Sequence, residues 1–523
     1  MGHHTNRTDS SRTSQEFCLN RRDFVSLSSL GVLCGSPIPK CARAAAASFS
    51  AAGFQNDLGD ITAKPIDAKV KVKPLCVGLV HSCAYEGPCR PKGLPPTIEV
   101  PQASDDAARF VNALKDGIST QDAELMEPAI LTHDETFTLA PQEWKKLQPD
   151  AAQVDVYVSG VWPGRAPGLE RFGKPVVALG QGPGELDVAA AFRYRGVGGF
   201  VAYDVADLNQ LISLLRVQKA LKETGLLLVT DRRGLPAMCV NSSIPLPVLK
   251  EKLGIRTEVV SYKDFFDQMQ MIAASPEGQD RARAITDKVV RQAAKVYIDR
   301  NHILTDAMFY LTVRSFFHQY KLNAFAIDCI ELCGSQIPNR QHFTPCLTHT
   351  LLKDQGIPSA CENDINALGA MAIAGYTCRK SIYMGNPSYL REKGLLKVGH
   401  DVAGLKMKGL DQPDLPYELR NFTEGGWGTT FRYDFSRDKG EPVVLSRLDP
   451  SATKLLVAKG TMEGGVGFDQ IGCTLRALVR VPNLMDMFHA HAEFGNHLTM
   501  TYGDCARDLR RAAEFMKLGV VEV

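Results

Sequence analysis

From about residue 70 to residue 390, short apolar runs alternate with longer amphipathic segments. Residues 71–80 (KVKPLCVGLV) form an apolar run of strand length, and residues 105–117 (DDAARFVNALKDG) follow with an acidic first turn and a glycine stop, as in a helix. Residues 207–225 repeat the helical pattern, with leucines gathered on one face. Strands that alternate with helices predict parallel sheets covered by helices on both faces. We therefore expect an α/β protein with two Rossmann-like domains in this part of the chain.

The pattern changes near residue 400. Short strand-like segments follow one another, separated by turns and without helices between them: LPYELRNF, WGTTFRYDF, PVVLSRL and TKLLVAKGTM. This succession predicts a mostly antiparallel, β-rich and barrel-like C-terminal domain, which ends with a helix in residues 504–519. The expected divisions are a leader and linker in 1–50, an N-terminal α/β domain in 51–175, a second α/β domain in 176–395 and the β-rich domain in 396–523.

The first fifty residues differ from the rest. Arg21 and Arg22 precede a short, mildly apolar stretch, and an A-x-A sequence follows at residues 42–44. Paired arginines, a weak apolar region and such a cleavage site are typical of a twin-arginine signal peptide. The alternative is a disordered tail with a chance arginine pair. The favoured interpretation predicts export to the periplasm or the cell exterior, already folded.

Composition excludes several classes of function. The net charge is +2, so nothing indicates binding to nucleic acid or to an anionic membrane. No long apolar window predicts a membrane span in the mature chain. The fourteen cysteines include no C-x-x-C pair. We interpret most of them as small buried hydrophobes, with a disulfide in the exported protein as the alternative.

Two acids stand in the otherwise apolar segment ACENDINALGAM, residues 360–371. Glu362 and Asp364 lie where a strand is expected to end and a helix to begin, which is where ligands bind in open α/β sheets. Asn386 follows in the next expected strand-to-loop junction, and His497 opens a late apolar strand. A carboxylate, an amide oxygen and an imidazole can bind Mn²⁺ or Mg²⁺. The alternatives are a Glu362 stabilised by the helix dipole and a His497 hydrogen-bonded at a strand edge.

The order of these motifs resembles the L-fucose isomerase and L-arabinose isomerase superfamily. The resemblance covers roughly residues 70–523 and is strongest in GIPSACENDINALGAM, YMGNP and FGNHLTMTYGD with the terminal helix that follows. It implies a Mn²⁺ site, or a site for another divalent cation such as Mg²⁺, with Glu362, Asn386 and His497 as ligands. Where the family has an aspartate, this chain has Asn386. Asp364 is expected to be structural.

The resemblance also implies a reaction and an assembly. Family members interconvert aldoses and ketoses through a cis-enediol, at a site between the second α/β domain and the C-terminal domain that a neighbouring subunit completes. It therefore implies a monosaccharide substrate and a homo-trimer or homo-hexamer. The resemblance implies catalytic positions at Glu362 and Asn386. Glu362 would be the base, because Asn386 can donate an oxygen to a metal but cannot accept a proton.

Several other side chains are candidates for contact with the sugar. They are His400, Trp427, His491 and Asn496. For the histidines and the asparagine the alternative is a loop without a role in binding, and for Trp427 it is core packing. Arg447, in the expected strand PVVLSRL, is interpreted as an outward-facing strand residue.

Three functional hypotheses follow. The first is a metal-dependent monosaccharide isomerase. The second is a carbohydrate-active metalloenzyme of another reaction type, which would tolerate the loss of the second acid at Asn386. The third is a non-catalytic sugar-binding protein. Bound metal separates the first two hypotheses from the third, and turnover of aldoses separates the first from the second.

Overall fold

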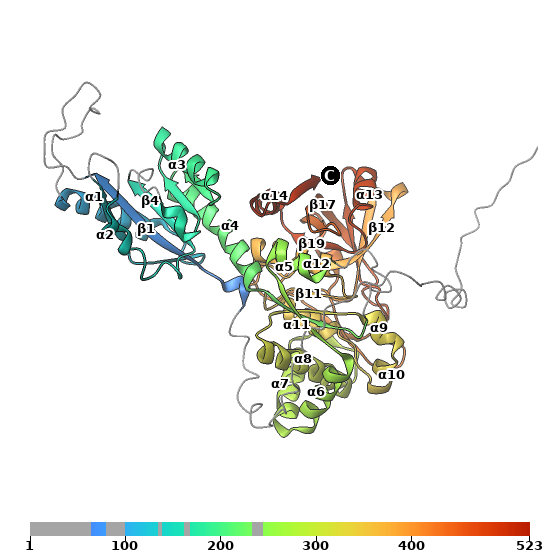
Figure 1. Ribbon diagram of the computed structural model, residues 1–523. Coiled ribbons are helices and arrows are strands. Elements are labelled where there is room, and N and C mark those ends of the chain that lie inside the picture. Colours follow the sequence, from blue (N-terminus) through green and yellow to red (C-terminus); the bar gives the residue numbers. More distant parts are fainter. Residues whose placement is uncertain (1–63, 80–99, 134–138, 162–167, 233–243) are drawn as a thin grey trace, which may run out of the picture. The chain divides into compact units, whose positions relative to one another are not determined.

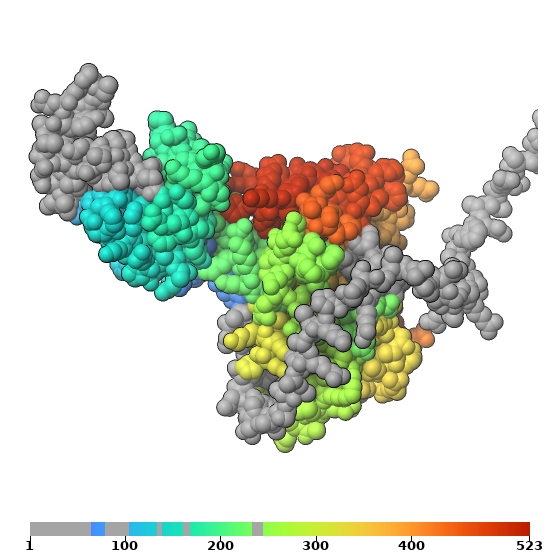
Figure 2. All heavy atoms as spheres, viewed as in Figure 1, coloured from blue at the N-terminus to red at the C-terminus, as the bar shows by residue number. Residues whose placement is uncertain are grey.

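The computed structural model describes residues 64–79, 100–133, 139–161, 168–232 and 244–523, and the remaining residues are drawn in grey in Figure 1 and Figure 2. All described residues belong to one compact unit, Asn56–Val523. The expected twin-arginine leader in residues 1–50 lies outside the described residues. Among those residues, no helix combines the length and the apolar character needed to cross a membrane.

The first sheet is parallel and surrounds β1. Its strand order is β2-β1-β4-β5-β6, and β3 also pairs with β1. The strands are β1 (Val70–Leu79), β2 (Ala123–Leu125), β3 (Ala129–His133), β4 (Val156–Val161), β5 (Val176–Leu179) and β6 (Gly199–Ala202). The helices of this region are η2 (Pro65–Asp67), α1 (Val100–Gly117), α2 (Pro141–Lys145), η4 (Leu169–Phe172), α3 (Pro183–Tyr194) and α4 (Val205–Glu223).

Helices cover both faces of this sheet. Val70 and Val72 of β1 pack with apolar side chains of α1 and α4, whereas Leu75 and Val77 of the same strand pack with those of α2 and α3. Because successive side chains of a strand point to opposite faces, a strand covered on both faces carries apolar side chains at odd and even positions alike. The apolar run at residues 71–80 therefore predicted this arrangement correctly.

The second sheet is also parallel, with the order β11-β10-β7-β8. Its strands are β7 (Gly225–Val229), β8 (Arg256–Val260), β10 (Ala324–Ile327) and β11 (Ser359–Ala360). Its helices are α5 (Leu246–Leu253), α6 (Tyr262–Ala274), α7 (Pro276–Gln292), α8 (Arg300–Tyr320), α9 (Cys329–Gly334), α10 (Ile337–Gln341), α11 (Cys346–Lys353) and α12 (Ile365–Cys378). The two parallel sheets with their helices confirm the expected α/β fold class (Figure 1).

The C-terminal part contains a closed antiparallel ring. The strand order is β16-β19-β12-β13-β18-β17, and β17 pairs back with β16 to close it. The strands are β12 (Tyr383–Leu390), β13 (Leu395–Gly399), β16 (Pro442–Leu448), β17 (Lys454–Val466), β18 (Arg476–Arg480) and β19 (Leu498–Tyr502), and β20 (Gly519–Glu522) adds to β17 in parallel. The expected β-rich, barrel-like region is thus confirmed, and its ring takes in β12, which begins before residue 396.

The remaining described elements form a small sheet and several short helices. A three-stranded sheet joins β9 (Lys295–Val296), β14 (Glu418–Asn421) and β15 (Thr429–Arg432). The helices are η5 (Arg391–Lys393), η6 (Phe435–Asp438), α13 (Leu484–His491) and α14 (Ala506–Phe515). Helix α12 connects the two regions, because it follows β11 of the second sheet and packs against β16 and β19 of the ring. Its residues 365–376 are all buried, as a helix that is apolar all round requires.

Candidate metal centre

Glu362 lies in the tight turn between β11 and α12. The strand ends at Ala360, and α12 begins at Ile365 with Asp364 as its N-cap, which accepts a hydrogen bond from the Ala367 amide at 2.8 Å. Glu362 and Asn363 have φ angles of 55° and 56°, in the left-handed region that non-glycine residues rarely adopt. Such backbone strain is concentrated at functional sites, where the surrounding structure enforces it.

Two histidines reach Glu362 from the ring. His400 follows β13 and His497 precedes β19, and both of these strands pair with β12. In that register Asn386 of β12 is opposite Gly399, and Gly385 is opposite Leu498. The two imidazoles therefore flank the same point of β12, at the ring edge that faces α12.

Glu362, His400 and His497 form a compact group whose candidate ligand atoms all lie within 4.8 Å of one another. Oε1 of Glu362 lies 3.2 Å from Nε2 of His400, and Oε2 lies 3.4 Å from Nε2 of His497. All three side chains are largely shielded from solvent, with His497 fully buried. A carboxylate between two imidazoles is a donor set that divalent transition metals accept.

The carboxylate of Glu362 is ionised in this arrangement. Burial raises its pKa, but hydrogen bonds with His400 and His497 outweigh burial and hold the pKa well below the usual carboxyl range. Burial lowers the pKa of His400, but the contacts with Cys473 and Glu362 outweigh it and raise the pKa to about 9. Nδ1 of His400 lies 3.3 Å from Sγ of Cys473. Without metal, the group is thus an ion pair around one carboxylate, and a metal would have to displace protons to bind.

Asp364 holds His497 in place and does not face the group as a ligand. Its Oδ2 lies 2.8 Å from Nδ1 of His497 and 2.8 Å from an Nη of Arg447, and its Oδ1 accepts from the Ala367 amide and from the other Nη. Burial raises the pKa of Asp364, but Arg447 and His497 together lower it to about 2. An ionised Asp364 accepts only, so Nδ1 of His497 carries a proton and donates to it, and Nε2 is the ring nitrogen that faces Glu362.

Arg447 is a fully buried residue, contrary to the outward-facing position expected from its strand. Besides Asp364, it donates to the carbonyl oxygens of Phe494 and His497 at 2.7 Å each. A buried guanidinium needs such partners because desolvation is otherwise costly. The alternation of β16 does not reveal this position, since both faces of the strand are buried between α12 and the ring.

The structure places Asn386 in a strand, and the loop position expected for it is wrong. β12 continues through Asn386 to Leu390 because residues 386–390 pair with β13. Its Cα partner is Gly399, directly before His400. Asn386 is partly exposed, and its side-chain amide forms no hydrogen bond with any described residue. It therefore lies beside the group, whereas His400, expected as a sugar contact, is a member of it.

The other expected sugar contacts have different surroundings. His491 is buried and uses both ring nitrogens: Nε2 donates to the Asn496 carbonyl at 3.0 Å, and Nδ1 accepts from the Tyr389 hydroxyl at 2.9 Å. Burial lowers the pKa of His491 to about 4, so the ring is neutral. His491 and Asn496 thereby shape the loop that leads to His497. Trp427 stacks on His342 with ring centroids 5.9 Å apart, and no described contact links it to the three-residue group.

The donor set fits a divalent cation. It offers an anionic oxygen and two imidazole nitrogens at short mutual range, and a carboxylate behind His497 fixes the ring orientation, as metal sites commonly require. No protein-family model matches the chain, and no curated protein is detectably similar to it. The three-residue group, together with the motif resemblance, is therefore the basis for a functional proposal.

Proposed function

We propose that this protein is a divalent-metal-dependent aldose–ketose isomerase that acts on a monosaccharide. Metal dependence is supported by the close approach of the Glu362 carboxylate to the imidazoles of His400 and His497. The resemblance of ENDIN, YMGNP and FGNH to the fucose and arabinose isomerase superfamily supports the choice of reaction and substrate class. The same resemblance supports a homo-trimer or homo-hexamer, and the twin-arginine pattern supports export.

The donor set favours Mn²⁺ over Mg²⁺. Mg²⁺ prefers oxygen ligands, whereas Mn²⁺ accepts imidazole together with carboxylate. Glu362, His400 and His497 would hold the ion, and the Asn386 amide oxygen is a further candidate ligand from the adjacent strand. When bound, the ion would act as a Lewis acid on the two oxygens at carbon 1 and carbon 2 of the sugar.

Among the described acids of this group, Glu362 is the one that can transfer the carbon-bound proton. The oxygens of Asp364 are occupied by Arg447, His497 and the Ala367 amide. Asn386 cannot accept a proton. Isomerisation moves the proton of carbon 2 to carbon 1 and the proton of the carbon-2 hydroxyl to the oxygen on carbon 1, so that atoms balance. In the proposal the carboxylate of Glu362 accepts the first of these protons and returns it to carbon 1.

The test combines metal analysis with a substrate screen. The purified protein is loaded with Mn²⁺ or stripped with a chelator, and a panel of aldoses is assayed for ketose formation. We expect turnover with Mn²⁺, loss of turnover after stripping, and loss of at least a hundredfold in Glu362→Gln. The matched control is Glu392→Gln, because Glu392 is an exposed residue of η5 without an ion pair among the described residues; its activity should equal that of the parent protein.

Each other outcome supports a rival hypothesis. Bound metal without isomerisation of any aldose favours a carbohydrate-active metalloenzyme of another reaction type. Sugar binding without bound metal favours a non-catalytic binding protein. Turnover that persists in Glu362→Gln would contradict the role of Glu362 as the base.

A further inference from the structure

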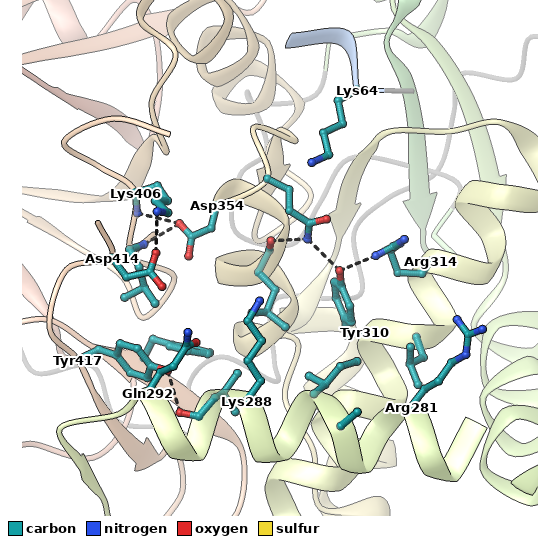
Figure 3. Close-up of a pocket in the computed structure, with 18 residues that line it drawn as sticks. Lys64, Arg281, Lys288, Gln292, Tyr310, Arg314, Asp354, Lys406, Asp414 and Tyr417 are labelled. Carbon is teal, nitrogen blue, oxygen red and sulfur yellow. Dashed lines mark hydrogen bonds and ion pairs between the residues drawn. The ribbon is translucent and has the colours of Figure 1, made fainter. Parts of the chain in front are cut away.

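A pocket separate from the metal centre opens beside α7 and α8. Its volume is about 440 Å³, and side chains from both helices, from the segment after α11 and from residues 405–417 line it. Neither Glu362 nor either histidine of the metal centre belongs to this lining. Figure 3 shows the polar lining residues arranged around Tyr310 and Lys288. A pocket of this size can hold a small organic molecule.

The lining carries an excess of positive charge. Its cations are Lys64, Arg281, Lys288, Arg314 and Lys406, and its anions are Asp354 and Asp414. The two acids lie on the left of Figure 3, and each has a partner nearby. Nζ of Lys406 lies 3.0 Å from Asp414, and Asp354 accepts hydrogen bonds from the backbone amides of Leu405 and Lys406. Lys64, Arg281 and Lys288 therefore line the pocket without an acid of the lining to balance their charge.

Two of these cations have no counter-ion among the described residues. The ammonium groups of Lys64 and Lys288 take part in no ion pair within the described ranges, and both lie on the lining. Arg281 pairs with Glu277 of the same helix at 3.0 Å, and both side chains are about one-third exposed. Such a partly exposed pair contributes little to stability, so Arg281 can also bind an anion at the pocket.

Tyr310 gives the pocket a fixed hydroxyl donor. Its oxygen accepts from Arg314 at 2.9 Å and from Nε2 of Gln355 at 2.9 Å, and Nε2 also donates to the Leu351 carbonyl (Figure 3). With both lone pairs used, the hydroxyl proton of Tyr310 has no described acceptor. Tyr310 and Arg314 are only 5% and 9% exposed, so this donor is held rigidly at the pocket wall.

We propose that this pocket binds a small phosphomonoester with a hydroxylated body, such as a sugar phosphate. Lysine and arginine side chains with a fixed hydroxyl donor are the groups that recognise phosphate oxygens. The opposite end, near Asp414, Gln292 and Tyr417 (Figure 3), offers polar groups to the hydroxyls of such a body. The site would act independently of the metal centre.

Isothermal titration at low ionic strength tests this proposal, with EDTA present so that the metal centre takes no part. The probes are glucose 6-phosphate, glucose and inorganic phosphate. We expect saturable binding of glucose 6-phosphate, none of glucose, and at least tenfold weaker binding of inorganic phosphate. Lys288→Gln should weaken binding of glucose 6-phosphate about tenfold, as expected for a lost hydrogen bond to a charged group.

Arg291→Gln is the matched control, because Arg291 is an exposed cation of the same helix that does not line the pocket. It should change the dissociation constant less than twofold. The proposal is overturned by any of three results: no saturable binding of glucose 6-phosphate, equal weakening in Lys288→Gln and Arg291→Gln, or inorganic phosphate binding as tightly as glucose 6-phosphate.

Discussion

Nδ1 of His497 lies 2.8 Å from Oδ2 of Asp364, and Nε2 on the other side of the same ring faces Glu362 at 3.4 Å. One acid of the ENDIN segment thus orients the imidazole, and the other shares the candidate metal centre with it. The two acids differ in role because Asp364 caps α12 and is held by Arg447, whereas Glu362 is turned toward the ring by a left-handed backbone.

Asp364→Asn should weaken metal binding by about 10- to 100-fold without removing a ligand, because an amide holds the His497 ring less firmly than a carboxylate. Titration with Mn²⁺ measures this effect. Asp449→Asn is the control. Asp449 accepts hydrogen bonds from the backbone amides of Thr453 and Lys454 in the turn after β16, so this substitution should lower stability and leave metal affinity unchanged. An Asp364→Asn protein with the parent affinity would refute the positioning role.

Glu362→Gly should be more stable than Glu362→Ala by about 1 kcal/mol, because glycine adopts a φ of 55° without the cost that a Cβ incurs there. Denaturant unfolding of the metal-free proteins gives the difference. At Glu392, whose φ is not positive, the Gly variant should be no more stable than the Ala variant. If Ala is the more stable residue at both positions, the backbone of Glu362 is not strained.

Asn386→Asp should raise isomerase activity, because it restores a carboxylate where the resembled family has one and places it opposite Gly399, beside His400. We expect at least a tenfold gain in kcat/KM for the preferred aldose, with a shift of the pH profile as the added carboxyl titrates. Asn421→Asp in β14 serves as the control for an added charge. No change in either rate or pH profile would mean that Asn386 does not face the substrate.

Lys353 should make stability depend on pH. It is fully buried at the end of α11 and donates to the Val402 carbonyl at 2.6 Å, and burial lowers its pKa from 10.5 to about 7. Between these two pH values the unfolded chain binds the proton that the folded protein lacks, so stability rises with pH across this window, by about 5 kcal/mol. Lys353→Met should flatten this rise in denaturant unfolding curves, whereas exposed Lys222→Met should not; a rise of equal size in Lys353→Met would contradict the assignment.

Local patterns predicted much of the fold. Burial on both faces gives the parallel strands mostly apolar sequences, and Asp364, the N-cap of α12, marks the start of a helix. Glu362 and His497 were found through motifs at element boundaries. His400 was not assigned to the metal group, since only the pairing of β13 with β12 brings it to Glu362. Arg447 was missed because its strand is buried on both faces, so alternation carries no signal. The continuation of β12 past Asn386 likewise depends on a partner strand that is itself identified only in the folded structure.

We propose that Glu362, His400 and His497 bind one divalent cation together. Titration of the metal-free protein with Mn²⁺, followed by the electron paramagnetic resonance signal of the free ion, tests it most directly. We expect one tightly bound Mn²⁺ per chain and loss of at least a hundredfold in affinity in each of Glu362→Gln, His400→Gln and His497→Gln. Parent-like affinity in His400→Gln, or no bound Mn²⁺ in the parent protein, would contradict it.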